Sequence, residues 1–409
     1  MKVSLIALII FSFLFSGLSY ADSSKPTFSG SDVKALIPVL KHHDTVGLTV
    51  IDKEGVPESI NLATRIRAKR DTVFNIFKDP DNFYYISTLF KENKILDSTD
   101  NMILWSWASR HSLFTITGKN SIELYGDRRA DVKVIESSIG KASFILRFYE
   151  DGPDYTILTI SGFLNVQSSQ WLIKFIIGNS SSMIQAFNIA VGFFVIKGIK
   201  SLAEREEKKL PKRIHITNGR SGGTPQKLSG GELKLLSPFL NRGQVFLCDS
   251  HTGGRLKQAT VIERVNSSAE KFIETVKKPE NYEKNIGAIN NIKIISSPEN
   301  DNKNEILFSW NLGFAVFQLT SNNKLTVPVE NLVLLESVDG DLEGSKWLWQ
   351  IEKESEKSSI VVYHAFADVA KMSAILDSTV KREPYLEHGL VMGSNIVMVK
   401  AMKKIAESK

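Results

Sequence analysis

One long stretch, residues 180–204 (SSSMIQAFNIAVGFFVIKGIKSLAE), constrains the fold of this chain more than any other segment. Three serines can cap the start of a helix, and Lys197 and Lys200 suit the negative end of its dipole. Between these ends the stretch is apolar on nearly every helical face, and such a helix must be buried on several sides. Gln185 and Asn188 interrupt it, which disfavours a membrane span. We therefore predict a long core helix around which its domain is built.

The same pattern occurs a second time near the end of the chain. Residues 191–204 match residues 394–407 at a constant offset of 203 positions. Further blocks repeat in the same order at offsets of 199 to 203: 28–40 with 228–240, 65–83 with 264–282, 104–107 with 307–310, and 158–166 with 361–369. Such a series indicates duplication of a whole domain. We therefore predict two similar domains, 28–208 and 228–409, joined by an exposed linker at 209–227 that is rich in charge, Gly, Ser and Pro.

The first 21 residues have the pattern of a secretory signal. Lys2 forms a short basic region, residues 3–15 are apolar, and Ser19-Tyr20-Ala21 is a small-x-small cleavage motif. A membrane anchor is the alternative interpretation, but the apolar run is short for a span. We expect a signal peptide at 1–21, cleavage after Ala21, and a secreted or periplasmic protein.

Each copy reads as one strand, two short helices, six further strands and the long helix. In the first copy, a leading helix capped by Ser31 and an irregular stretch containing Gly47 come before the first strand. Alternation of apolar and polar residues predicts that strand at 60–68, and the later strands at 94–97, 102–109, 112–117, 131–137, 142–150 and 155–166. Turns are predicted between them, including one at Gly118-Lys119-Asn120. Short connections favour antiparallel pairing. We predict an α+β fold, with a curved antiparallel sheet wrapped on the long C-terminal helix.

Few residues indicate catalysis or metal binding. The sequence contains no HExxH, CxxC, GxSxG or P-loop motif. The only cysteine, Cys248, lies in an apolar run and is expected to be a buried, inert thiol. His42-His43-Asp44 favours a solvated helix end over a metal site, because adjacent residues rarely point at one ion. We expect no catalytic residues, no metal and no cofactor.

Charge gives a weak indication of partners. The 409 residues carry a net charge of +6, from 51 basic and 45 acidic side chains. Aromatic and basic residues are not interleaved in the manner of nucleic-acid binders, so we expect no nucleic-acid partner. The basic excess around 208–220 suits a solvated linker, or a weak attraction to anionic lipid headgroups.

The segment 65–83 begins in the predicted strand 60–68. From residue 68 onward it has the pattern A-x-x-D-x-V-F-x-x-F-x-D-P-x-N-F. Together with the element order and the closing helix, this segment resembles the START-like (SRPBCC) superfamily of polyketide cyclases and lipid-transport proteins, here in two tandem copies. Residues 167–178 are similar to the segment that precedes the last helix in lipid-transfer members. The resemblance covers nearly all of 28–409. It implies a helix-grip fold whose gap between helix and sheet holds a lipid, sterol, polyketide or other apolar small molecule.

The implied cavity identifies candidate ligand-lining residues, although the same side chains could instead form only the core. His364, flanked by Tyr363 and Phe366, favours a structural role over ligand contact. The segment 171–178 is more apolar than an exposed loop requires, so Trp171 and Phe175 are the candidate membrane contact and gate of the first domain, unless they pack into its core. The candidate lining residues are Trp105, Trp107, Phe114, Phe144, Leu146, Phe148, Phe187, Val191 and Phe194 in the first copy, and Trp310, Phe317, Trp347, Trp349 and Val397 in the second.

Three functions are compatible with these features. The first is binding or transfer of a lipid or other apolar molecule, with transient contact to a membrane surface. The second is a cyclase or hydrolase acting on a hydrophobic substrate, which would need an acid–base pair inside the cavity. The third is a module that binds a partner protein without a ligand. The sequence favours the first function, and a non-enzymatic role.

Overall fold

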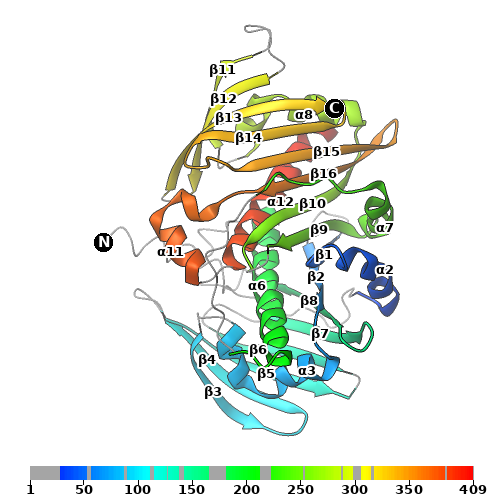
Figure 1. Cartoon of the computed structure of the whole chain (residues 1–409), viewed down its shortest axis with the longest axis vertical. Helices are drawn as coiled ribbons and strands as arrows, with labels where there is room; N and C mark the ends of the chain where they lie inside the picture. The colour runs from blue at the N-terminus through cyan, green and yellow to red at the C-terminus, as the bar shows by residue number, and fades with distance from the viewer. Residues whose placement is uncertain are drawn as a thin grey trace. The chain divides into compact units, whose positions relative to one another are not determined.

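The structure is a computed structural model whose described residues form two compact units (Figure 1). The first unit comprises the described residues up to 211 and residues 382–389. The second unit comprises the described residues of 223–381 and 390–408. The expected signal peptide and most of the expected linker lie outside the described residues. The described residues are 28–52, 57–86, 90–110, 115–126, 128–137, 142–164, 181–211, 223–251, 254–286, 289–297, 305–314, 317–382 and 385–408.

The first unit is an antiparallel sheet with a long helix after its last strand. Its strands lie in the order β1-β2-β8-β7-β6-β5-β4-β3, and every described pairing is antiparallel. The elements are α2 (Gly30–Leu40), β1 (Thr45–Ile51), β2 (Pro57–Ile66), α3 (Arg70–Asn75), η1 (Ile76–Lys78), η2 (Pro80–Asn82), α4 (Phe83–Ile86), β3 (Phe90–Ser98), β4 (Met102–Arg110), β5 (Thr115–Tyr125), β6 (Arg129–Ser137), β7 (Ala142–Glu150), β8 (Thr156–Leu164) and α6 (Ser181–Glu207).

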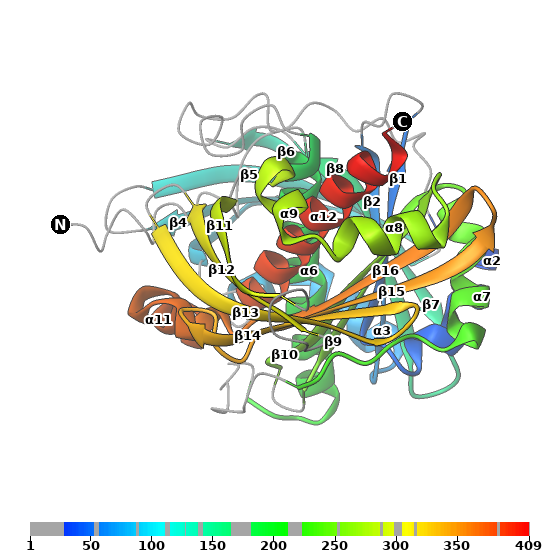
Figure 2. The ribbon, with the colours of Figure 1, turned by 90° about the horizontal axis from the view of Figure 1, so that it is seen from above.

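The second unit repeats this arrangement. Its strands lie in the equivalent order β9-β10-β16-β15-β14-β13-β12-β11, and in Figure 2 the yellow and orange strands curve on one side of the red helix α12. The elements are α7 (Gly230–Leu240), β9 (Gly243–Ser250), β10 (Leu256–Val265), α8 (Ala269–Val276), α9 (Pro279–Asn285), β11 (Ile289–Ser296), β12 (Glu305–Phe314), β13 (Phe317–Val329), β14 (Leu332–Gly340), β15 (Lys346–Ser355), β16 (Ser358–Phe366), η4 (Val369–Met372), α11 (Ala374–Arg382) and α12 (Tyr385–Glu407).

Three local expectations from the sequence were wrong. The leading helix α2 is capped by Ser29, because Asp32 completes a capping box with that residue rather than with Ser31. The stretch containing Gly47, expected to be irregular, is strand β1, since its alternating Thr and Val side chains pair with β2. The turn expected at Gly118-Lys119-Asn120 does not exist, and β5 runs through these residues to Tyr125.

Helix α6 is buried along most of its length, as its apolar sequence predicts. It packs chiefly on β2, with further contacts to α4, α3 and β8. A Cβ atom at Gly192 would lie 2.5 Å from Cδ1 of Leu62, so the helix approaches the sheet closely there. By length and composition it is the one described helix that could cross a membrane, but 65% of its most apolar window is buried. Four side chains on different faces of the helix are fully buried: Ile189, Phe193, Ile196 and Ile199.

A polar cluster on the outer face of the second sheet holds the segment that leads into α7. Gln350 accepts from the main-chain N–H of Leu228 at 2.9 Å and donates to its carbonyl at 3.0 Å. Gln258 makes the same pair of bonds with Gln226, at 2.6 and 3.0 Å. His364 is fully buried, with Nδ1 3.0 Å from Gln258 Nε2 and Nε2 3.3 Å from Gln350 Oε1. The structural role expected for this histidine is therefore confirmed.

The C-terminal end of each long helix is tied to its sheet by an ion pair, and the carboxylate comes from a different position in each unit. In the first unit Asp44, just before β1, meets Lys197 at 3.1 Å and Lys200 at 3.5 Å. In the second unit Gln244 stands at the position equivalent to Asp44, and the carboxylate is that of Glu263 on β10.

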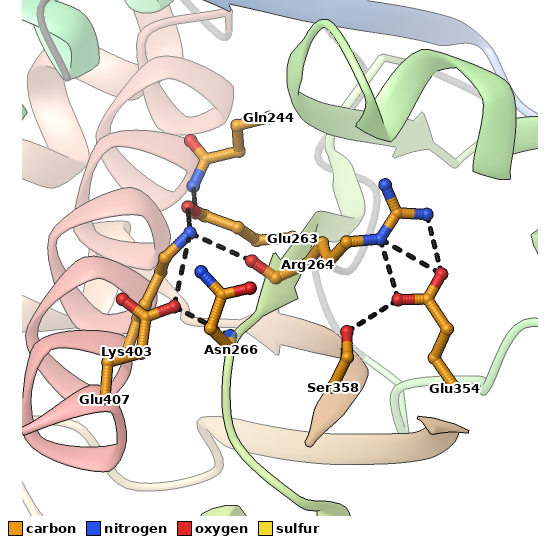
Figure 3. Close-up of polar contacts among 8 residues, drawn as sticks. All are labelled: Gln244, Glu263, Arg264, Asn266, Glu354, Ser358, Lys403 and Glu407. Carbon is orange, nitrogen blue, oxygen red and sulfur yellow. Dashed lines mark hydrogen bonds and ion pairs between the residues drawn. The ribbon is translucent and has the colours of Figure 1, made fainter. Parts of the chain in front are cut away.

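The second of these ion pairs is part of a wider polar network (Figure 3). Nζ of Lys403 lies 2.7 Å from Oε1 of Glu263, and it also donates to the carbonyl of Arg264 at 2.9 Å. Gln244 donates to the other oxygen of Glu263. Glu407 accepts from the main-chain N–H of Asn266 at 2.8 Å. Side chains of α12 therefore hold the end of β10 in place.

Lys400 and Lys403 are one turn apart on α12, and we expect opposite effects when each is replaced by Met. Lys403→Met leaves the carboxylate of Glu263 buried without its cation, and should cost about 3 kcal/mol of the free energy of unfolding. Lys400 is half-buried, and burial, with a smaller effect of the Lys403 charge, lowers its pKa despite the opposing charge of Glu263. Lys400→Met should therefore stabilise the protein, by about 1 kcal/mol at pH 7.

The pH dependence separates this effect from simple packing. A lysine whose pKa is lowered in the folded state weakens folding at low pH, and the penalty disappears as pH rises toward its ordinary value of 10.5. The gain from Lys400→Met, measured by urea denaturation, should therefore shrink between pH 7 and pH 10. Equal losses from both substitutions would contradict this assignment.

Candidate ligand-binding face

The face of the first sheet that points toward α6 can be followed from strand to strand. Leu62 marks it on β2 through its contact with Gly192, and Gln185 marks it on β1 by donating to Thr49 Oγ1 at 2.9 Å. Directly paired residues share a face of a sheet. The pairings extend this face to Leu158, Ile160 and Gly162 on β8, Phe144, Leu146 and Phe148 on β7, Ala130 and Val132 on β6, Asn120, Ile122 and Leu124 on β5, and Ile103, Trp105 and Trp107 on β4.

The described strand residues that the sequence marked as ligand-lining all lie on this face. Most are buried, and Phe144 is half-buried. On α6, Phe194 is buried and Val191 is half-buried. Phe114, Trp171 and Phe175 lie outside the described residues, as does the side chain of Phe187. The buried members are Trp105, Trp107, Leu146 and Phe148.

Aromatic rings close one end of this face. The ring of Phe148 lies 5.3 Å from that of Phe74 and 5.5 Å from that of Phe77, both edge-on. Phe77 contacts Phe83 at 5.7 Å, and Phe83 contacts Trp105 at 5.1 Å. Edge-on rings at these distances are typical of packed cores. Trp105 and Phe148 therefore belong to the core beneath the short helices.

Half-buried apolar side chains occur on another part of the face and on α6. On the strands they are Val132 and Val134 of β6 and Phe144 of β7, which is paired with Val132. On α6, Ile184 and Val191 are half-buried at a spacing of seven residues, two helical turns. An apolar surface that its own chain does not cover completely is where an apolar ligand gains the most from burial.

Trp107 explains why β5 runs through the expected turn. A Cβ atom at Gly118 would lie 2.5 Å from Cζ2 of Trp107, so the indole occupies the space that any side chain would need. The same indole donates from Nε1 to Oδ1 of Asn120 at 3.2 Å. Gly118 and Asn120 are thus needed for the packing and the hydrogen bond of Trp107 on the neighbouring strand, and they do not form a turn.

The equivalent face of the second sheet carries larger rings. Trp349 stands where the first unit has Leu146, Tyr363 where it has Ile160, and Trp347 where it has Phe144. The rings of Trp349 and Tyr363 lie 4.1 Å apart. At these three positions the second unit therefore has larger side chains than the first.

Sequence reasoning found Trp310, Trp347 and Trp349 on this face but missed their partners. Phe272 packs edge-on against Trp349 at 5.6 Å, and Tyr282 accepts from Trp349 Nε1 at 3.2 Å. The alignment of residues 65–83 with 264–282 could have identified Tyr282, which stands where the first copy has Phe83. The side chain of Phe317 lies outside the described residues, and Val397 is half-buried on α12.

Two buried tyrosines of the second unit are held in their neutral forms. Burial raises the pKa of Tyr282, against the opposing effect of the N–H donated by Trp349, and burial also raises the pKa of Tyr363. The face residues named above for the first unit are all apolar or neutral. Across the described part of the chain, no group of three or more His, Cys, Asp or Glu side chains could hold a metal ion.

Comparison with known proteins finds similarity in structure only. No family model matches the sequence, and no curated protein does. The di-domain ARO/CYC StfQ from the steffimycin biosynthetic pathway is 9% identical, covers 85% of this chain and 98% of its own, and has a TM-score of 0.28. A STAR-related lipid transfer protein from Xanthomonas axonopodis is 15% identical over 36% of this chain and 85% of its own, with a TM-score of 0.28.

Norcoclaurine synthase from Thalictrum flavum, in complex with dopamine and hydroxybenzaldehyde, is 15% identical over 37% of this chain and 89% of its own, with a TM-score of 0.28. Two arrangements thus occur among the matches: a di-domain protein along most of this chain, and single-domain proteins along about a third of it.

Gly118→Ala tests the packing of Trp107. The new methyl group would displace the indole and its bond to Asn120, so we expect a loss of about 2 kcal/mol in the free energy of unfolding. Gly126→Ala is the matched control, because a Cβ atom there meets nothing within 4 Å. Urea denaturation of both variants should show a change of less than about 0.5 kcal/mol for the control. Equal stability of the two variants would contradict the packing described.

Proposed function

We propose that this protein binds a lipid or another apolar small molecule between α6 and the sheet of the first unit. The observation that carries this proposal is the half-buried apolar set formed by Val132, Val134 and Phe144 on the sheet and by Ile184 and Val191 on the helix. Covering such side chains with hydrocarbon contributes about 25 cal/mol for each Å² removed from water.

The contrast between the two units supports the first as the main binding unit. Its central positions are occupied by Leu146 and Ile160, whereas the second unit has Trp349 and Tyr363 there, with ring centroids 4.1 Å apart and the rings tilted by 38°. Large rings in mutual contact leave less room for a long hydrocarbon chain. The second unit therefore serves mainly as a structural partner with respect to this ligand.

Two other functions have less support from the structure. A cyclase or hydrolase would need a positioned acid and base at the ligand, and the named face residues of the first unit include neither. A partner-binding module without a ligand would favour a completely packed interior, which describes the second unit better than the first. Ligand binding without catalysis is accordingly the function that we propose.

The sequence is the basis for the proposed location of the protein and for the proposed exchange of its ligand. A signal peptide at 1–21 would deliver the protein to the periplasm or outside the cell. An apolar ligand in such a compartment is taken from and returned to membranes, so we propose that the protein transfers it during transient contact with a membrane surface. The apolar segment that contains Trp171 and Phe175 is the proposed contact.

Val132→Trp tests the binding face by placing a large ring among the half-buried side chains. Binding of cis-parinaric acid, followed by its fluorescence, should weaken at least tenfold, because the ring occupies the volume that the hydrocarbon would fill. Ile135→Trp, at an exposed position on the same strand, is the control and should bind within twofold of the parent. Circular dichroism would verify that both variants are folded. Unchanged binding in a folded Val132→Trp variant would rule out this face.

The double substitution Trp171→Ser and Phe175→Ser tests the membrane contact. We expect weaker co-sedimentation with liposomes of phosphatidylcholine and phosphatidylglycerol, and transfer of the probe between liposomes slowed at least fivefold. Binding of cis-parinaric acid in solution should remain, because neither residue belongs to the binding face described above. Transfer at the parental rate by a correctly folded variant would remove this segment as the gate.

A further inference from the structure

Lys400 on α12 is a half-buried lysine that makes no hydrogen bond and no ion pair with the described residues. The next lysine along the helix, Lys403, is engaged in both ways. Its Nζ lies 2.7 Å from Oε1 of Glu263 and donates to the carbonyl of Arg264 at 2.9 Å. The polar network of Figure 3 therefore includes the second lysine of this pair and leaves the first one out.

The duplicated domain has the same two lysines, and there an acid reaches both of them. Lys197 stands where the second copy has Lys400, and Lys200 stands where it has Lys403. Asp44 meets these lysines at 3.1 and 3.5 Å respectively. Lys197 is only 4% exposed, and a buried ammonium group is tolerated when it is paired with an acid in this way.

Two replacements on the sheet account for the difference between the units. Gln244 occupies the position of Asp44, and Glu263 on β10 occupies the position of Thr64 on β2. The acid of the second unit thus lies on the next strand and pairs with the other lysine. The amide of Gln244 donates to that same acid. Lys400 therefore keeps the place of its counterpart in the first unit without the carboxylate that belongs there.

This environment favours the neutral form of the amine. Burial is the largest cause of the lowered pKa of Lys400, and the charge of Lys403 adds to it. The carboxylate of Glu263 opposes both effects and does not cancel them. A desolvated lysine, or one beside a second cation, is an activated nucleophile in proteins, because more of its amine is unprotonated near pH 7.

We propose that the ε-amine of Lys400 is a reaction site for small aldehydes, with which it forms a Schiff base. The lone pair of the nitrogen attacks the carbonyl carbon, and a proton moves from nitrogen to oxygen. The carbinolamine then loses water to give the C=N bond, so no oxidant or reductant is needed. The side chain is half-exposed to solvent, and the reaction requires neither an interior cavity nor the ligand proposed for the first unit.

Reductive alkylation of the full chain tests this proposal. Propanal and sodium cyanoborohydride at pH 7 trap each Schiff base as a propylated lysine, and peptide mass spectrometry gives the rate at each position. Lys234 on α7 is the reference, because it is exposed. Lys400 should react at least fivefold faster than Lys234, although it is the less exposed of the two. This ratio should fall as the pH rises toward 10.5, where an ordinary lysine also loses its proton.

A matched pair of variants locates the cause. Gln244→Asp restores the acid of the first unit and should slow the reaction of Lys400 at least fivefold, because the carboxylate holds the amine in its ammonium form. Gln244→Asn has the same shape without the charge, and its Lys400 should react within twofold of the parent rate. In all three proteins Lys197 should react more slowly than Lys234, since it is buried beside Asp44.

A rate at Lys400 no higher than that at Lys234 would overturn the proposal, since the amine would then have no nucleophilic advantage. Equal slowing in Gln244→Asp and Gln244→Asn would also overturn it, because the effect would not depend on the charge. Neither outcome depends on the binding of cis-parinaric acid, so this site and the binding face of the first unit can fail separately.

Discussion

Burial of one long apolar helix against a curved sheet is the interaction on which each unit depends. In α6 the four faces represented by Ile189, Phe193, Ile196 and Ile199 are all fully buried, so the helix cannot exist in water without the elements around it. The sheet has the complementary need, because one of its faces is apolar from β2 to β4. The close approach at Gly192 and Leu62 joins the two surfaces at their centre.

Duplication kept this packing and changed the details that surround it. The ion pair at the end of the helix survives in both units, but its carboxylate moves from Asp44 to Glu263 on the neighbouring strand. In both units an acid meets the second of the two equivalent helix lysines, Lys200 or Lys403, so the ion pair is made in two ways. The interior changed more, since Leu146 and Ile160 became Trp349 and Tyr363. One scaffold thereby has two interiors with different side chains.

Much of the fold could be predicted from the chain alone. The strand β7 has the bounds expected from alternation, and the long helix begins and ends within three residues of its predicted bounds. The described strand residues chosen as candidate lining residues in the first copy do share the face toward α6. One prediction failed where a glycine and an asparagine pack against a side chain of the neighbouring strand. Gly118 and Asn120 resemble a turn in sequence, yet Trp107 requires both within a strand.

The sequence by itself determined the repeat, the α+β class, the buried helix and the alternation that sends one set of side chains inward, because these depend on local periodicity and on the order of segments. Only the tertiary structure decided which inward residues are sealed in the core and which are half-buried, because that depends on contacts between strands far apart in the chain. It also decided that Lys197 has an acid partner and that Lys400 has none among the described residues. The two lysines are equivalent in the repeat, and which of them meets an acid depends on whether the carboxylate lies at Asp44 or at Glu263.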